Sequence, residues 1–116
     1  MRYKKGGHYA HHNDYFLVKD TPEASENNRI ATLLLYLDQP SEGGETIFPR
    51  AMPGVIGHSD ERFAFDIDFD ACDVGLKTVA KPGDGILFFS QYPSLTLDVH
   101  SLHGGCPVEG GTKWGE

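Results

Sequence analysis

The segment Lys81-Pro82-Gly83-Asp84-Gly85-Ile86-Leu87-Phe88-Phe89-Ser90 joins a turn directly to an apolar run. Proline and glycine in the two central positions are typical of a type II turn, and the run from Gly85 to Ser90 predicts a core strand. Further toward the N-terminus, residues 29–37 (RIATLLLYL) are long, apolar and rich in β-forming residues, and they predict a second buried strand.

Shorter segments of the same kind fill the rest of the chain. The patterns predict further strands at 9–16, 45–48, 63–70, 76–79, 102–108 and 112–114, a turn at Gly43-Gly44, and loops at 20–28 and 52–60. Segment 63–70 alternates large apolar residues with Asp66, Asp68 and Asp70, which we place on its wet side. Short strands joined by Gly/Pro turns favour a sandwich, a barrel or a jelly roll. We expect the all-β jelly roll, with few or no helices, because its facing sheets form a pocket that can hold a metal ion.

Composition narrows the class of protein. A chain of 116 residues with 39% hydrophobic and 23% charged residues predicts one globular domain, 1–116. The net charge of −7 argues against a nucleic-acid partner, which usually needs a basic surface. No apolar run approaches the roughly 18 residues of a membrane span. Gly6-Gly7 follows the basic start where a signal peptide would be apolar, so no export signal is predicted.

His12 and Asp14 are the first candidate metal ligands. Two residues apart on a strand, they would share one face. A second histidine would complete a set of two histidines and one carboxylate, which leaves coordination positions open for chemistry. His100 and His103 are the candidates, and their spacing places them on opposite faces of an extended strand, so at most one enters the pocket.

Two other readings of these residues stay open. His12 and Asp14 are also compatible with solvated polar residues on a strand. The cluster of His8, His11 and His12 is compatible with an accidental zinc or nickel site.

Lys113 and the two cysteines also have alternative interpretations. A lysine buried beside a metal pocket needs an anionic partner, which a dicarboxylate co-substrate would supply, whereas a surface lysine near the chain end needs none.

Cys72 and Cys106 are too few for a disulfide scaffold and lack zinc spacing. They are either two buried thiols or one bridge, which would imply an oxidising compartment.

Taken in order, the motifs resemble the catalytic domain of prolyl 4-hydroxylases, which are Fe(II)- and 2-oxoglutarate-dependent dioxygenases. The resemblance extends from Tyr3 to Trp114, except for residues 50–74, where Cys72 alone matches. The matching motifs are Tyr3 with Gly6, Tyr9-x-x-His12-x-Asp14-Tyr15-Phe16, Arg29-x-Ala31-Thr32-x-Leu34-x-Tyr36-Leu37, Gly43-Gly44-Glu45-Thr46-x-Phe48-Pro49, Lys81-Pro82-x-x-Gly85-x-Leu87-Phe88-Phe89, Ser101-Leu102-His103-x-Gly105-Cys106-Pro107-Val108, and Gly111-x-Lys113-Trp114.

The resemblance implies a double-stranded β-helix, a jelly-roll variant, and a role for each matching position. Because the family's domain has further structure before the Tyr3 motif and after Lys-Trp, we expect a core truncated at both ends. His100 is not the implied ligand. The implied roles are iron ligation by His12, Asp14 and His103; 2-oxoglutarate binding by Lys113, Tyr3 and Thr46; peptide binding by Tyr9 and Arg29; and a disulfide between Cys72 and Cys106.

The implied reaction is the hydroxylation of peptidyl proline to 4-hydroxyproline, with conversion of 2-oxoglutarate and O₂ to succinate and CO₂. L-Ascorbate is expected to restore oxidised iron. The implied partner is a proline-rich peptide or protein, and the implied location is the lumen of the endoplasmic reticulum, or the cytoplasm if the chain has no leader. The alternatives are an inactive jelly-roll module that binds a peptide or sugar, and a 2-oxoglutarate oxygenase acting on another protein side chain or a small molecule.

Overall fold

The computed structural model describes residues 1–16, 28–51 and 70–115, and these form two four-stranded antiparallel sheets and one two-stranded pair. The first sheet has the order β1-β10-β3-β7 and the second β2-β8-β5-β6, while β4 pairs with β9. The strands are β1 (Arg2–Tyr3), β2 (Tyr9–His12), β3 (Ala31–Asp38), β4 (Glu42–Gly43), β5 (Thr46–Phe48), β6 (Leu76–Thr78), β7 (Gly85–Phe89), β8 (His103–Gly105), β9 (Val108–Gly110) and β10 (Lys113–Gly115).

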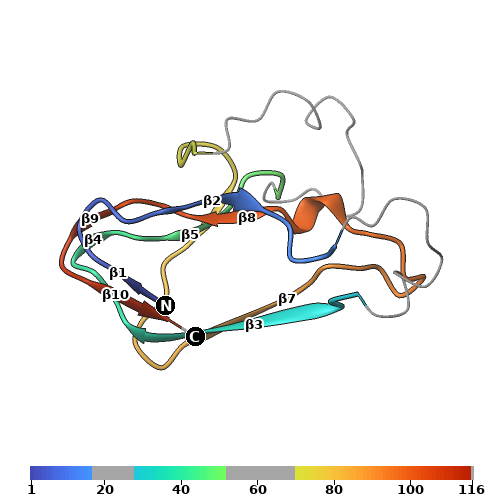
Figure 1. Cartoon of the computed structure of the whole chain (residues 1–116), viewed down its shortest axis with the longest axis horizontal. Helices are drawn as coiled ribbons and strands as arrows, with labels where there is room; N and C mark the ends of the chain where they lie inside the picture. Colours follow the sequence, from blue (N-terminus) through green and yellow to red (C-terminus); the bar gives the residue numbers. More distant parts are fainter. Residues whose placement is uncertain (17–27, 52–69, 116) are drawn as a thin grey trace.

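The two larger sheets lie as facing layers that converge where β4 pairs with β9 (Figure 1). Strands remote in sequence pair with one another, as β1 does with β10 and β2 with β8. The chain ends also meet, since the Met1 amino group donates a hydrogen bond to the Gly115 carbonyl at 2.6 Å. This arrangement confirms the all-β jelly-roll class.

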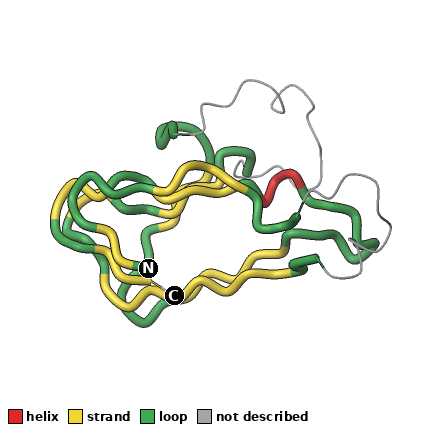
Figure 2. Tube along the Cα trace, in the orientation of Figure 1, coloured by secondary structure: helices red, strands yellow, loops and turns green. Residues whose placement is uncertain are grey.

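Helical structure is almost absent from the described residues. One turn of 3-10 helix, Val99–Ser101, precedes β8 (Figure 2). Nothing among these residues is a helix of the length and apolarity needed to cross a bilayer.

The turn that leads from β6 into β7 has the geometry that its sequence predicts. The Asp84 amide donates to the Lys81 carbonyl at 2.9 Å, and Gly83 has φ +91°, as the third position of a type II turn requires. After the turn, β7 pairs with β3, which lies much earlier in the chain, from Leu35↔Gly85 to Ala31↔Phe89. The predicted turn is therefore confirmed.

The prediction that residues 29–37 form a buried strand is correct for one face only. Side chains of β3 alternate, so Thr32, Leu34 and Tyr36 point between the sheets, whereas Leu33 is 56% exposed. Sequence hydrophobicity could not show this, because an apolar run is compatible with burial on one face or on both.

Other expectations fail or fall outside the described residues. Strand β2 ends at His12, so Asp14 lies in a bend beyond it and not on the same strand. His100 lies in the 3-10 turn, where a strand face had been expected. The loops predicted at 20–28 and 52–60 and the strand at 63–70 fall wholly or mainly outside the described residues.

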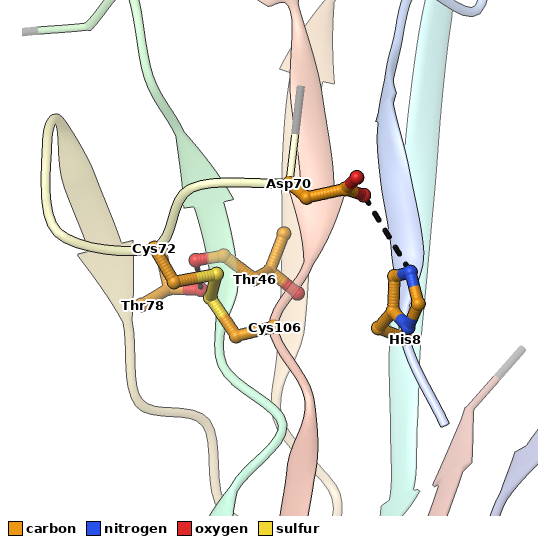
Figure 3. The surroundings of a disulfide bond; sticks show 6 residues. All are labelled: His8, Thr46, Asp70, Cys72, Thr78 and Cys106. Atoms are coloured by element: carbon orange, nitrogen blue, oxygen red, sulfur yellow. Dashed lines mark hydrogen bonds and ion pairs between the residues drawn. A yellow bond between two sulfur atoms is a disulfide. The ribbon is translucent and has the colours of Figure 1, made fainter. Parts of the chain in front are cut away.

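A disulfide links the segment before β6 to the segment between β8 and β9 (Figure 3). Cys72 and Cys106 are 34 residues apart with a Cα–Cα distance of 5.9 Å. The Cys106 amide donates to the Glu45 carbonyl at 2.8 Å, just before β5. The bridge therefore fastens the outer part of the second sheet to its central strands.

Removing this bridge should destabilise the fold. Closing a loop of this length is worth roughly 3–4 kcal/mol in the chain-entropy model. We expect the double variant Cys72→Ser, Cys106→Ser to lower the free energy of unfolding by about this amount in urea titrations. Dithiothreitol should lower the midpoint of the wild-type chain and leave that of the double variant unchanged. Equal midpoints for oxidised and reduced wild-type protein would contradict the stabilising role.

Candidate metal centre and adjoining cavity

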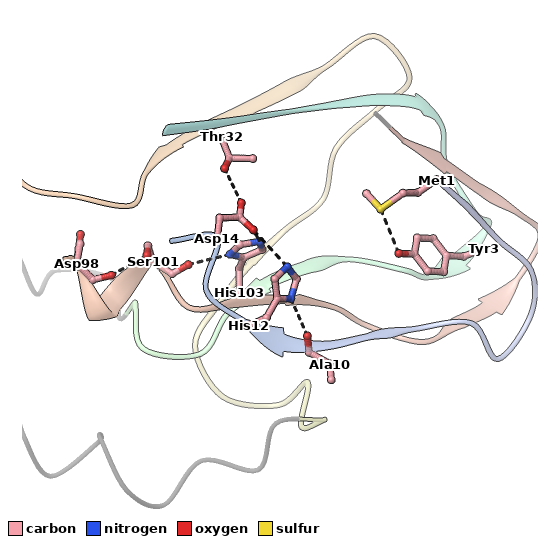
Figure 4. Close-up of polar contacts among 9 residues, drawn as sticks. All are labelled: Met1, Tyr3, Ala10, His12, Asp14, Thr32, Asp98, Ser101 and His103. Carbon is pink, nitrogen blue, oxygen red and sulfur yellow. Dashed lines mark hydrogen bonds and ion pairs between the residues drawn. The ribbon is translucent and has the colours of Figure 1, made fainter. Parts of the chain in front are cut away.

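Two histidines and an aspartate from separate segments gather between the sheets (Figure 4). His12 ends β2, His103 begins β8, and the antiparallel register places these residues opposite each other. Asp14 Oδ1 lies 3.5 Å from His12 Nε2 and 3.7 Å from His103 Nε2. Within the described residues, this is the one group of three or more His, Cys, Asp or Glu side chains spaced to hold a metal ion.

Backbone carbonyls determine which ring nitrogen of each histidine is available. His12 Nδ1 lies 2.9 Å from the Ala10 carbonyl and His103 Nδ1 lies 2.8 Å from the Ser101 carbonyl. A carbonyl only accepts, so Nδ1 carries the proton and the Nε2 lone pair faces Asp14. Burial lowers the pKa of His103, which favours the neutral form that binds metals. Two imidazole nitrogens and one carboxylate oxygen fit a divalent ion such as Fe(II).

A cavity of about 240 Å³ extends from this cluster toward Lys113 on β10. Lys113 is only 7% exposed and, among the described residues, it forms no ion pair. Burial lowers its pKa, and the charge of Glu45 opposes this shift. Because an unpaired buried ammonium is unfavourable, this end of the cavity suits an anionic group.

Two hydroxyl-bearing residues named from the sequence also line the cavity. The Lys113 ammonium lies 6.0 Å from the centre of the Tyr3 ring, and burial raises the pKa of Tyr3 so that its hydroxyl keeps its proton. Thr46 is buried and shares a hydrogen bond with the Tyr36 hydroxyl. Tyr3, Thr46 and Lys113 therefore meet the same cavity as the three candidate ligands.

The two expected substrate-side residues differ in position. Tyr9 lines the cavity, is 48% exposed, and has its ring centre 4.2 Å from that of His12. Arg29 does not line the cavity, and its guanidinium instead lies over the Phe16 ring at 4.8 Å. The structure thus brings Tyr9, but not Arg29, to the candidate site.

The remaining described histidines are not members of the three-residue cluster, although His8 lines the same cavity. His100 Nδ1 lies 3.1 Å from Asp98 Oδ1, a group that also caps the 3-10 turn. His8 pairs with Asp70 at 3.5 Å (Figure 3), and His11 is not among the three grouped residues. The arrangement gives no support to a site built from His8, His11 and His12.

Sequence reasoning missed two residues that line this cavity, Thr32 and Phe88, and one that supports its lining, Tyr36. Thr32 donates to Asp14, Tyr36 contacts Thr46, and the Phe88 ring lies 4.6 Å from that of His103. Thr32 and Tyr36 occur in the motif that begins at Arg29, at alternate positions. That parity could have identified both as inward-facing.

Comparison with known proteins identifies the class. Residues 1–115 match the family model described as the 2OG-Fe(II) oxygenase superfamily, and the chain belongs to this family. It is 41% identical over 115 residues to probable prolyl 4-hydroxylase 9 of Arabidopsis thaliana, covering 98% of this chain and 36% of that protein. Prolyl 4-hydroxylase 5 of the same plant is 37% identical over 115 residues, with 98% and 38% covered. The chain thus spans less than two fifths of these curated relatives.

A solved structure agrees with this assignment. The chain resembles the crystal structure of the viral collagen prolyl hydroxylase from Paramecium bursaria Chlorella virus-1 in its 2OG complex. The TM-score is 0.67 with 32% sequence identity, covering 97% of this chain and 50% of the viral chain.

The cluster should bind a divalent ion through His103 and not through His100. We expect His103→Ala to weaken Mn²⁺ binding by at least about 100-fold, since loss of a ligand should exceed the 10–100-fold effect of losing an outer contact. Isothermal titration with Mn²⁺ alone measures this. His100→Ala is the matched control and should bind Mn²⁺ as the wild type does. Retained binding in His103→Ala together with lost binding in His100→Ala would contradict the assignment.

Proposed function

We propose that this chain is the catalytic core of a prolyl 4-hydroxylase, which converts peptidyl proline to 4-hydroxyproline while 2-oxoglutarate and O₂ become succinate and CO₂. The observation that carries the proposal is that one cavity contains both the ligand cluster and the buried Lys113. A chelating dicarboxylate needs these two features at the two ends of its site. The family and the prolyl hydroxylase relatives support the same reaction.

His12 Nε2, His103 Nε2 and a carboxylate oxygen of Asp14 would hold Fe(II). When bound, iron would supply the activation of O₂ that is coupled to oxidative decarboxylation of 2-oxoglutarate. A set of three protein ligands leaves positions for exogenous groups. The histidine tautomers fixed by Ala10 and Ser101 keep both Nε2 atoms available for this purpose.

The other end of the cavity would bind the distal carboxylate of 2-oxoglutarate. The Lys113 ammonium attracts it in a site of low dielectric, where an ion pair is stronger than in water. The protonated Tyr3 hydroxyl can donate a second interaction, and Thr46 bounds the site. Enclosure between the sheets limits the access of water to the reacting groups.

The proposal also covers the peptide substrate and the cellular compartment. Tyr9, exposed at the cavity, would contact the proline-containing peptide, whereas Arg29 would contact it only outside the cavity. The Cys72–Cys106 disulfide supports an oxidising compartment such as the endoplasmic reticulum lumen. L-Ascorbate would maintain the ferrous state of the iron.

Succinate production tests the reaction. With Fe(II), 2-oxoglutarate and a proline-rich peptide, we expect succinate to form together with 4-hydroxyproline, and chelation of iron should abolish both products. A folded chain that forms no succinate would contradict the proposal and favour the non-catalytic module. Succinate formation unaffected by the peptide would instead favour an oxygenase with another substrate.

The pH profile tests Lys113. Only the protonated amine attracts a carboxylate, and burial lowers the pKa of Lys113, so 2-oxoglutarate affinity should fall as pH rises through that lowered value. The alkaline limb of kcat/KM for 2-oxoglutarate should therefore begin at a lower pH than for an exposed lysine.

Two substitutions check this interpretation. Lys113→Ala should raise KM for 2-oxoglutarate at least about 30-fold, the effect of removing one partner of a buried charge pair. Lys113→Arg should move or remove the alkaline limb, because a guanidinium stays charged. An identical alkaline limb in wild type and Lys113→Arg would show that another group causes it.

A further inference from the structure

The two oxygens of the Asp14 carboxylate have different partners. The Thr32 hydroxyl donates to Oδ2 at 2.5 Å, while Oδ1 is the oxygen that lies 3.5 and 3.7 Å from the two imidazoles (Figure 4). Thr32 is therefore bonded to the oxygen that faces away from the shared centre. Asp14 is only partly exposed, and Thr32 lines the same cavity.

The hydrogen bond connects the two sheets. Asp14 follows β2 of one sheet, and Thr32 belongs to β3 of the other. Thr32 has a fixed place on β3, where it pairs with Phe88 of β7, whose ring packs against His103. A β-branched side chain also has few rotamers, so the hydroxyl is held in place. Because Asp14 lies in a bend and not in a strand, this contact supplies an orientation that its backbone does not.

A carboxylate that is free to rotate can bind a metal with one or both oxygens. Two-oxygen binding would occupy a position that a chelating co-substrate needs. We propose that Thr32 is a positioning residue, which holds Oδ2 and leaves Oδ1 alone to face the metal. The inference rests on the metal site of the proposed function and adds to it the residue that fixes how Asp14 is used.

Metal titration separates this role from a general effect on the fold. Thr32→Val removes the hydroxyl but keeps the shape, and Thr32→Ser keeps a hydroxyl. The matched control is Thr78→Val, because Thr78 donates a comparable bond to the Thr46 carbonyl away from the cluster. The probe is Co²⁺ alone, followed by calorimetry and by its absorption bands, with urea midpoints measured for every variant.

We expect Thr32→Val to weaken Co²⁺ binding about 10–100-fold, as for other groups that orient a ligand. Thr32→Ser should stay near the wild-type value, and Thr78→Val should match it. If Thr32→Val does not fold, Thr32→Ala removes the same hydroxyl without packing a methyl group against the carboxylate and should show the same loss. A merely structural role would instead lower the urea midpoint without a selective loss of metal affinity.

The possible failures can be told apart. If the wild type binds Co²⁺, His103→Ala abolishes binding and Thr32→Val binds as tightly as the wild type, the role of Thr32 is overturned while the metal site stands. If the wild type does not bind Co²⁺, or His103→Ala binds it normally, the metal site fails and the inference fails with it.

Discussion

The pairing of β2 with β8 is the constraint on which the rest of the site depends. It places His12 opposite His103, although these residues lie near the two ends of the chain. Backbone carbonyls within or next to the same two strands then hold Nδ1 of each ring and leave Nε2 for the shared centre. A shift of one residue in this register would turn one imidazole to the other face of the sheet. Main-chain hydrogen bonding thus determines the chemistry of the side chains.

The facing sheet, β1-β10-β3-β7, contributes the hydroxyl groups and the buried cation of the site. The inward-facing side chains of β3 include a hydroxyl at each end and the apolar Leu34 between them. The Thr32 hydroxyl donates a hydrogen bond to Asp14, and the Tyr36 hydroxyl shares one with Thr46. Lys113 enters from the neighbouring β10 as a buried cation. The cavity therefore has a neutral nitrogen and carboxylate end and a positive end, a polarity that suits a dicarboxylate bridging the two.

The sequence predicted those parts of the fold that local chemistry determines. The turn at Lys81–Asp84 follows from proline and glycine conformations, and the all-β class follows from short apolar segments between turns. It did not predict the exposed face of β3, which depends on what other elements cover. It also placed Asp14 on a strand, because no local signal marks the end of β2 at His12.

The site residues likewise include some that the sequence could identify and some that only the tertiary structure shows. Spacing alone left His100 and His103 as equal candidates, whereas the structure places His100 in a 3-10 turn capped by Asp98 and His103 at the start of β8, within the cluster. The structure gathers most of the residues named from the family motifs at one cavity, with Arg29 as an exception. The role of Thr32 required knowledge of which β3 positions face inward and what lies opposite. Cross-sheet contacts of this kind depend on tertiary structure, which a single sequence does not contain.

Anomalous diffraction from crystals of the chain grown with Mn²⁺ and 2-oxoglutarate tests the central claim most directly. The account predicts one manganese peak coordinated by His12 Nε2, His103 Nε2 and a single oxygen of Asp14, with the co-substrate extending from the ion to the Lys113 ammonium. A peak coordinated by other side chains, or a co-substrate bound away from Lys113, would contradict it.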